Sequence, residues 1–388
     1  MDQSGVSIVT LILLAGIVSV EAGFSTAILE IVSGVIASNY FGLKEVFWID
    51  FLANFGLLGV MFFAGFETEV RVLQKYYKKS LKIALPSFAV PFILTYAVTT
   101  TVLGLDQTAA ILMSIGMSTT SLALVFPYLR EEGLLKMEIG QILFASAMFV
   151  DLMSMFSLSF FFTGLSIGTL LFIVFIVGAL YILPHVGQWF FKRYCENMVE
   201  VELRFIMLTL VGLSFLSESV GIHSAVLAYL IGISMSSLLE NHEELENKLR
   251  GIVYGFMGPI FFFQSGYLMD LTHFNLETLK VTGILTIVAF GSKYISTRVS
   301  VKRVLGRGSR LSALFFNYRL TFGIIVVLLG FRQGIIDEVL YTAALSTILI
   351  SSIISSISLK ITPTETLYKI KGRRCKPKKK KGKKYRLG

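Results

Sequence analysis

Long apolar segments recur along almost the whole chain, and they constrain its fold more than any other feature of the sequence. About thirteen of them are candidates to cross a bilayer as helices, separated by short loops. Within lipid, every backbone polar group must be satisfied internally, which restricts such segments to helices here. Only 15% of the residues are charged, whereas about a quarter are charged in a soluble domain. The sequence therefore predicts an all-α polytopic membrane protein.

The basic character of the chain is concentrated at its end. The net charge is +10, but the stretch from Lys369 to Gly388 holds twelve Lys or Arg residues and no acid. We therefore divide the chain into a transmembrane domain over residues 1–362 and a cytoplasmic tail over residues 363–388 that is expected to be disordered. A basic block of this kind is attracted to anionic lipid headgroups, so the expected partner is the lipid bilayer and not nucleic acid.

The distribution of Lys and Arg between loops predicts the orientation, because cytoplasmic loops carry the excess of positive charge. Loops after odd-numbered segments are basic, as between Arg71 and Lys82 and between Arg298 and Arg310. The alternate loops carry isolated bases only, namely Lys44, Lys280 and Arg332. We expect a multi-pass protein of the cell membrane with its amino terminus outside and its carboxyl terminus in the cytoplasm.

One acid, Asp151, lies near the middle of the sixth segment, which runs from about Glu138 to Thr163. Burial of a charge at the bilayer midplane costs about 2.5–3.5 kcal/mol on insertion scales, so acids kept there are generally functional. We interpret Asp151 as the residue where a proton and a transported metal cation compete. Glu30 and Glu218 are weaker candidates, and Glu218 is expected to be a structural residue near an external loop.

The fifth segment gathers small hydroxyl residues beside a glycine at mid-membrane: Ser114, Gly116, Ser118, Thr119, Thr120 and Ser121. This composition favours a helix that unwinds at the midplane, which is tolerated only where the backbone lines a cavity. Hydroxyls and carbonyls at such a break are hard oxygen ligands, so Ser118, Thr119 and Thr120 are candidate ligands for Na⁺. The alternative is a close helix crossing through small residues.

Two more charges fall inside apolar segments, Lys293 in the eleventh and Arg319 in the twelfth. We expect both to compensate charge around the ion site. Lys293 is also near a basic loop, so its ammonium group can alternatively reach the surface by snorkelling. Arg319 is interpreted either as a structural counter-charge to the carbonyls of an interrupted helix or as a direct participant in transport.

Segments four to six and eleven to thirteen share one organisation. Each set has a continuous span, an interrupted polar span and a further span, with opposite predicted orientations. Inverted repeats with paired interrupted helices indicate a secondary transporter whose substrate site lies at the bilayer midplane.

Four motifs carry a resemblance to a known family: Gly56–Glu69, Ser118–Gly133, Ile139–Asp151 and Gly258–Leu271. Together they resemble the monovalent cation:proton antiporter superfamily, particularly the NapA-like Na⁺/H⁺ exchangers of its antiporter-2 branch. The resemblance covers nearly everything from Leu11 to Leu359. It implies a NapA/NhaA-like fold with two crossed discontinuous helices, a core domain that moves against a dimerising panel, and a homodimer.

The resemblance also implies residue roles. Asp151 corresponds to the ion- and proton-binding aspartate, Ser118–Thr120 to part of the broken helix, and Lys293 to a lysine in the span before the second broken helix. The chain departs from the family pattern at Val150, where relatives carry Asp, Asn or Gln. The family lysine commonly pairs with that first acid, so Lys293 is expected either to pair with Asp151 or to have no acidic partner. It also keeps only Arg319 of a Pro-Arg-Gly-Glu element in the twelfth span.

The expected function is exchange of Na⁺ or Li⁺ for H⁺, with no enzymatic activity and no cofactor. With a single acid, electroneutral 1:1 exchange is the simplest stoichiometry. The nearest alternative is a K⁺/H⁺ antiporter or K⁺ efflux transporter of the same superfamily. A passive channel and a symporter of organic anions stay open as further alternatives. An intramembrane aspartyl protease is disfavoured because it would need two acids that share a proton.

Overall fold

The computed structural model describes residues 3–22, 25–43, 47–68, 70–162, 167–194, 200–218, 224–239, 242–273 and 275–361. Within these ranges the chain is helical between short turns, and they contain no strand. Helices occupy every segment that the hydropathy pattern marks as a candidate span. The basic tail, with its expected disorder and lipid contact, lies outside the described residues.

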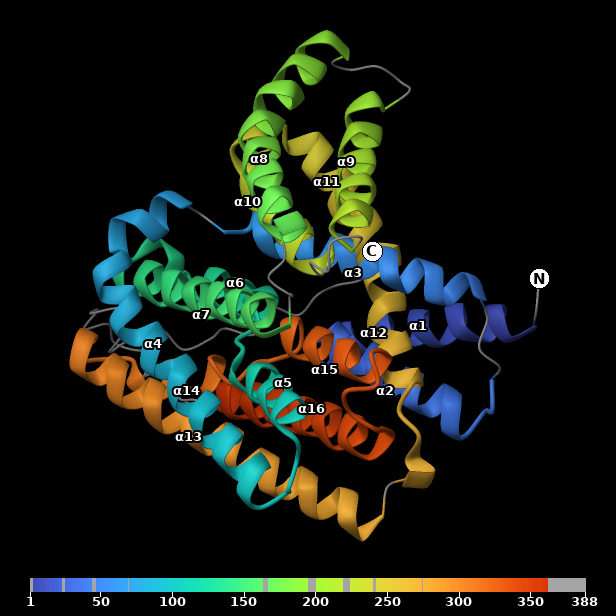
Figure 1. The fold of residues 1–388 in the computed structure, drawn as a ribbon, viewed down its shortest axis with the longest axis vertical. Helices are drawn as coiled ribbons and strands as arrows, with labels where there is room; N and C mark the ends of the chain where they lie inside the picture. Colours follow the sequence, from blue (N-terminus) through green and yellow to red (C-terminus); the bar gives the residue numbers. More distant parts are fainter. Residues whose placement is uncertain are drawn as a thin grey trace, which may run out of the picture.

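The helices, labelled in Figure 1, are α1 (Gln3–Ala22), α2 (Thr26–Asn39), α3 (Phe47–Phe66), α4 (Val70–Thr101), α5 (Gln107–Ser118), α6 (Leu122–Glu131), α7 (Glu138–Phe162), α8 (Ile167–Tyr194), α9 (Val201–Glu218), α10 (Ser224–Leu239), α11 (Glu243–Ile252), α12 (Gly258–Tyr267), α13 (Leu276–Leu305), α14 (Ser309–Phe315), α15 (Phe322–Arg332) and α16 (Glu338–Ile361). Single turns of 3₁₀ helix lie at Leu134–Lys136 and Leu271–His273, and a π-helical turn at Val253–Met257 precedes α12.

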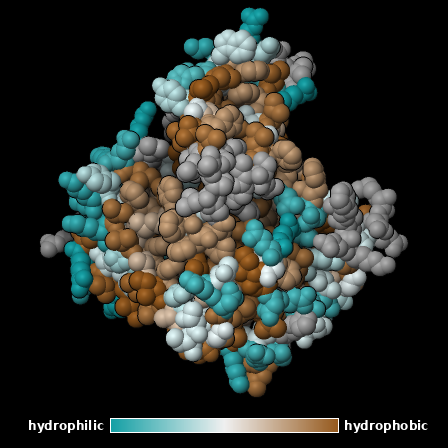
Figure 2. Space-filling view, in the orientation of Figure 1, coloured by the Kyte–Doolittle hydropathy of each residue, from teal (hydrophilic) through white to brown (hydrophobic). Residues whose placement is uncertain are grey.

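Six of the described helices are long and apolar enough to cross a membrane by length and composition: α1, α3, α4, α7, α8 and α16. Shorter apolar helices form α2, α10 and α15. Figure 2 shows hydrophobic residues over much of the left and middle of the visible face, with hydrophilic residues at its left and top edges and in patches across its lower right part. An apolar surface of this kind suits a protein whose solvent is the bilayer interior.

Two predicted loops are wrong, because the helices continue through them. The bases from Arg71 to Lys82 lie on the first turns of α4, and Arg298 to Arg303 lie on the last turns of α13. Lys and Arg are good helix formers, so a helix can extend beyond its apolar stretch without interruption. Pro184, expected to end the seventh segment, also lies inside α8.

Two triplets of spans share the organisation that the sequence predicts, and the middle span of each triplet consists of two helices. In the first, α4 has 32 residues, α5 and α6 have 12 and 10, and α7 has 25. In the second, α13 has 30, α14 and α15 have 7 and 11, and α16 has 24. The triplets are adjacent, since α13 packs on α4 and α15 packs on α5. We call these eight helices the core group (Figure 1).

The remaining helices, α1 to α3 and α8 to α12, form a second group, which we call the panel group. Within it α3 and α10 pack at backbone contact, because a Cβ at Gly65 would lie 2.0 Å from the Tyr229 carbonyl oxygen. A Cβ at Gly232 would likewise lie 2.0 Å from the carbonyl oxygen of Phe62. Small residues at helix contacts permit this close approach in membrane proteins. In Figure 1, α8 and α9 stand at the top, away from the core group.

Candidate functional site

The fifth segment is interrupted in its middle, as its cluster of hydroxyl residues predicts. Helix α5 ends at Ser118 and α6 begins at Leu122. Between them the backbone of Thr119 is extended, with φ −67° and ψ 165°, and Ser121 is extended as well. The last carbonyls of α5 therefore lack donors from a following helical turn, and they need partners from elsewhere in the protein.

The twelfth segment has a matching interruption, between the end of α14 at Phe315 and the start of α15 at Phe322. The two breaks are joined by hydrogen bonds. The Ser121 amide donates to the Tyr318 carbonyl oxygen at 2.7 Å, and the Thr120 hydroxyl donates to the Phe316 carbonyl oxygen at 3.1 Å. The two interruptions consequently form one unit in the middle of the core group.

Lys293, on α13, directs its ammonium group into the first break. It donates to the carbonyl oxygen of Ser118 and, at 2.8 Å, to that of Thr119. The side chain is 0% exposed, so the ammonium lies in the interior and does not snorkel to the surface. A buried cation is thereby paired with backbone carbonyls that the end of α5 leaves without helical donors.

Arg319 also binds the interrupted backbone. Its Nε donates to the Met117 carbonyl oxygen at 2.7 Å, and one terminal nitrogen donates to the Ala289 carbonyl oxygen at 2.8 Å. The same nitrogen donates to Asn317 Oδ1 at 2.9 Å. The guanidinium therefore ties α5 and α13 to the second break. These contacts are those of a counter-charge to broken-helix carbonyls, the first of the two alternatives for this residue.

Asp151, on α7, is 1% exposed, and its Oδ1 is buried without a hydrogen-bond partner. The carboxylate is within electrostatic range of Lys293, but the described side chains show no ion pair within 4 Å between them. Val150 beside it is fully buried and offers no polar atom. A buried carboxylate oxygen without a donor is costly when ionised, unless a proton or a cation neutralises it.

The three predicted hydroxyl ligands are all 0% exposed, and each hydroxyl makes a hydrogen bond. Ser118 donates to the Ile115 carbonyl oxygen at 3.0 Å, and Thr119 donates to that of Gly116 at 3.2 Å. A donating hydroxyl keeps its lone pairs, so these oxygens can still accept. The carbonyls of Ser118 and Thr119, in contrast, already accept hydrogen bonds from Lys293 in this structure.

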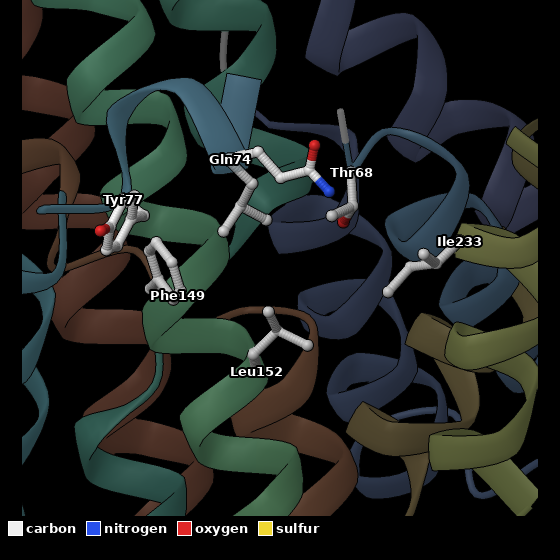
Figure 3. Close-up of a pocket in the computed structure, with 7 residues that line it drawn as sticks. Thr68, Gln74, Tyr77, Phe149, Leu152 and Ile233 are labelled. Carbon is white, nitrogen blue, oxygen red and sulfur yellow. The ribbon is translucent and has the colours of Figure 1, made fainter. Parts of the chain in front are cut away.

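A cleft of about 510 Å³ opens between the panel group and the core group. Its lining consists of Thr68, Leu73, Gln74, Tyr77, Phe149, Leu152 and Ile233. Phe149 and Leu152 flank Asp151 on α7, whereas Thr68 and Ile233 belong to the panel side (Figure 3). Sequence reasoning did not single out the lining, because its residues are ordinary apolar or polar types far apart in the chain.

Thr68 is hydrogen-bonded to Tyr229 on α10, with 2.9 Å between the two hydroxyl oxygens. Both side chains are buried, and the Tyr229 phenol lies in electrostatic range of Asp151. Neither residue was predicted as part of a site. The G-F-E-T-E motif at the end of the third segment contains Thr68 and was the only signal for it, but nothing in the sequence pairs it with Tyr229.

Glu67 precedes Thr68 and lies just beyond the end of α3, with 7% of its side chain exposed. Arg250 lies 3.5 Å from one of its carboxylate oxygens, and the other oxygen has no hydrogen-bond partner. Burial raises the pKa of Glu67 to about 7, although Arg250 lowers it. Glu30, a weaker candidate, is buried on α2 at 4% exposure, and the side chain of Glu218 lies outside the described residues.

These features define a class of protein: a multi-pass helical membrane protein with two interrupted helices and buried charges at the breaks, as in secondary transporters. The family model "Sodium/hydrogen exchanger, transmembrane" matches residues 8–364. The chain therefore belongs to the sodium/hydrogen exchanger family, in agreement with the resemblance of its motifs to cation:proton antiporters.

Individual relatives agree with this assignment. "Probable Na(+)/H(+) antiporter 3" of Methanocaldococcus jannaschii is 28% identical over 355 residues, covering 88% of this chain and 90% of the relative. The "Na(+)/H(+)-K(+) antiporter GerN" of Bacillus cereus is 25% identical, covering 90% and 92%. The solved structure of the sodium proton antiporter MjNhaP1 from M. jannaschii at pH 8 matches with a TM-score of 0.63 at 13% identity, over 95% and 99% of the two chains. That match establishes the fold.

Proposed function

We propose that this protein is a secondary active transporter that exchanges Na⁺ or Li⁺ for H⁺ across the cell membrane. One observation carries the proposal: the carboxylate of Asp151 is buried in the core group and has an oxygen without a hydrogen-bond partner. Two residues on either side of it on α7, Phe149 and Leu152, line a cleft. Family membership and relatives named as Na⁺/H⁺ antiporters support the choice of ions.

The chemistry follows from charge. A protonated Asp151 and a cation-bound Asp151 are both neutral, whereas the bare carboxylate carries an uncompensated charge in an apolar interior. Moving the bare form past the apolar walls of the protein is therefore unfavourable, and moving either loaded form is not. This difference couples the two fluxes, because the site returns across the barrier only after it has bound the other ion.

Exchange requires that the ion site reach both sides of the membrane in turn, which is the alternating-access mechanism. We propose that the core group moves against the panel group in an elevator-like cycle, with Asp151 exposed to each side of the membrane in turn. The two joined interruptions support an arrangement of crossed discontinuous helices, which fits about thirteen spans in inverted repeats. The distribution of bases supports an outside amino terminus and a cytoplasmic carboxyl terminus. A homodimer is proposed from the family resemblance.

A K⁺/H⁺ antiporter or K⁺ efflux transporter is the second candidate. One observation favours it, since the relative GerN is named as a Na⁺/H⁺-K⁺ antiporter. A single carboxylate surrounded by hydroxyl and carbonyl oxygens does not by itself discriminate between Na⁺ and K⁺. The proposed function places Na⁺ first because the other relatives compared above are named for Na⁺ alone.

Proteoliposomes test the function directly. The purified protein is reconstituted with a pH-sensitive dye inside, and Na⁺, Li⁺ or K⁺ is added for wild type and for Asp151→Asn. We expect Na⁺ and Li⁺ to move protons in the wild type, with complete loss in Asp151→Asn. Proton movement by K⁺ with equal efficiency would establish the second candidate. Exchange that persists in Asp151→Asn would show that another residue carries the ions.

The same liposomes determine the charge balance. A protein with one carboxylate that holds either H⁺ or Na⁺ is expected to exchange the two ions 1:1 without net charge. Collapse of the membrane potential with valinomycin and K⁺ should then leave the rate unchanged. A rate that follows the imposed potential would show instead that a second proton moves, for which Lys293, a buried group in electrostatic range of Asp151, is the candidate.

A further inference from the structure

The cleft lined by Phe149 and Leu152 of α7 has mostly apolar walls, which a hydrated cation would have to pass to reach Asp151 from this side. Leu73, Phe149, Leu152 and Ile233 offer no oxygen to a cation. The polar lining consists of Thr68, Gln74 and Tyr77. A small alkali cation gives up its water only where oxygen ligands replace it, so these polar groups decide whether the cleft can conduct the ion.

The hydrogen bonds of Thr68 fix which way its hydroxyl points. Its Oγ1 donates to the Ala64 carbonyl oxygen at 3.1 Å, which uses the one hydrogen that a threonine hydroxyl carries. The contact with Tyr229 at 2.9 Å therefore has the phenol as donor and Thr68 as acceptor. Of the two lone pairs of Thr68 Oγ1, one receives the phenol hydrogen and the other remains available to a ligand.

Gln74 faces Thr68 across the mouth of the cleft. It lies on the first turns of α4, in the core group, and Figure 3 shows its amide extended toward the Thr68 side chain with the amide nitrogen on the Thr68 side. The two residues come from different groups of helices, so an ion between them touches both the panel and the core. The hydrogen bond from Tyr229 orients the Thr68 side chain, and Tyr229 is itself in electrostatic range of Asp151.

We propose that Thr68 Oγ1, oriented by Tyr229, is a capture ligand for the transported monovalent cation. The second ligand of this site is the amide oxygen of Gln74, which reaches the Thr68 side when the exposed amide turns over. The cation exchanges part of its water for these oxygens before it reaches Asp151. This inference rests on the proposed function, since it assumes that Asp151 is the final site. Thr68 is a binding residue in this scheme, and Tyr229 is a positioning residue.

A purely structural role for the Thr68–Tyr229 contact makes a different prediction, and two variants separate the alternatives. Thr68→Val and Tyr229→Phe remove the same hydrogen bond, but only Thr68→Val removes the oxygen proposed as the ligand. If the oxygen binds the cation, Thr68→Val raises the KM for Na⁺ by about fivefold to tenfold with little change in maximal rate. Tyr229→Phe then raises the KM by about twofold or less, because Thr68 keeps its oxygen.

The experiment measures Na⁺-driven proton movement in proteoliposomes over a range of Na⁺ concentrations. Thr68→Ser should restore a KM near that of wild type, because it returns the hydroxyl. Thr209→Val is the matched control: Thr209 lies on α9 in the panel group and donates to the Phe205 carbonyl oxygen at 2.8 Å in the same i−4 manner. It does not line the cleft, so its KM should be that of wild type.

Gln74→Leu is a second variant that does not depend on a buried substitution, since Gln74 is exposed. We expect it to raise the KM for Na⁺ by about twofold to threefold. Equal increases in Thr68→Val and Tyr229→Phe would overturn the capture site, as would wild-type KM values in both Thr68→Val and Gln74→Leu. Persistence of exchange in Asp151→Asn would refute the proposed function instead, and the two failures are distinguishable in the same assay.

Discussion

The ammonium group of Lys293 donates hydrogen bonds to the carbonyl oxygens of Ser118 and Thr119, and it does so in preference to an ion pair with Asp151. The family resemblance left two possibilities for Lys293, pairing with Asp151 or having no acidic partner. In this structure its partners are backbone oxygens at the end of α5. The lysine is therefore bound to the interruption, and the carboxylate of Asp151 has an oxygen without a donor.

This arrangement predicts a stability defect in Lys293→Met that does not depend on Asp151. Each carbonyl left without a donor costs about 1–3 kcal/mol, so the Tm of the detergent-solubilised protein should fall by several degrees. The same loss should appear when Lys293→Met is added to Asp151→Asn, because the two carbonyls remain unpaired in either background. Thermal unfolding of wild type, the two single variants and the double variant measures this. If Asp151→Asn abolished the effect, the lysine would be acting through the carboxylate.

Arg319 should be intolerant even of lysine. Its guanidinium reaches Met117, Ala289 and Asn317 at once, and a single ammonium cannot reproduce this planar set of donors. We expect Arg319→Lys to lower the Tm and to reduce the maximal rate of exchange about tenfold through displacement of the interruption. The KM for Na⁺ should change little. A variant with a raised KM and a normal maximal rate would indicate direct participation in transport.

Glu67 should make stability depend on pH near neutrality. Burial raises its pKa to about 7 against the opposing effect of Arg250, with Glu246, Arg130 and Tyr254 as the other charged or titratable neighbours. An acid whose pKa is higher in the folded than in the unfolded state stabilises the fold at low pH relative to high pH. The stability should therefore fall as the pH rises from about 4.5 to about 7, by at most about 3 kcal/mol.

Glu67→Gln tests this sign. The Tm of the variant should depend less on pH between 5 and 8 than the Tm of wild type. The difference in Tm, variant minus wild type, should be larger at pH 8 than at pH 5. Glu246→Gln is a useful control, because Glu246 also contacts Arg250, at 2.9 Å, but its carboxylate is more exposed. A steeper pH dependence in Glu67→Gln would mean that the ion pair with Arg250 outweighs burial.

Arg332 and Asp50 form an ion pair at 2.5 Å, and Arg332 also donates to Asn54 at 2.7 Å. The pair joins the end of α15, in the core group, to the start of α3, in the panel group. The cleft lies near the other end of α3, at Thr68, which is about 27 Å away along the helix axis. The ion pair holds the core group and the panel group together at this end of α3. It therefore stabilises the conformation seen in this structure, in which the two groups are apart at the other end and the cleft is open.

Asp50→Asn should therefore shift the protein away from the conformation with the open cleft. A partly exposed ion pair contributes at most about 1 kcal/mol, which corresponds to about a fivefold change in population. Ile233→Cys, in a background with Ser at Cys195 and Cys375, reports on the cleft through its rate of reaction with a maleimide. We expect a slower rate when Asp50→Asn is added. An unchanged or faster rate would contradict the proposed effect of the ion pair. Asp337→Asn is the control, because it removes one negative charge as Asp50→Asn does but leaves the Arg332–Asp50 pair intact.

Local composition was sufficient to predict much of this protein. The apolar segments gave the helices, since a membrane span has no other way to satisfy its backbone. The hydroxyl residues from Ser114 to Ser121 predict the interruption after α5, and Asp151 is proposed as the ion site because an acid in an apolar segment is costly. The distribution of Lys and Arg did not predict the helix ends correctly. Lys and Arg next to a span continue α4 and α13, because charge does not distinguish a loop from an exposed helical turn.

The partners of the buried polar groups were decided by the tertiary structure alone. Lys293 is 175 residues from Ser118, and Thr68 is 161 residues from Tyr229, so neither contact leaves a periodic signal in the sequence. Their positions depend on how closely the helices approach, as α3 and α10 do at Gly65 and Gly232. Hydropathy predicts which side chains are buried. The partner of each buried polar group is decided by the helix that packs against that group.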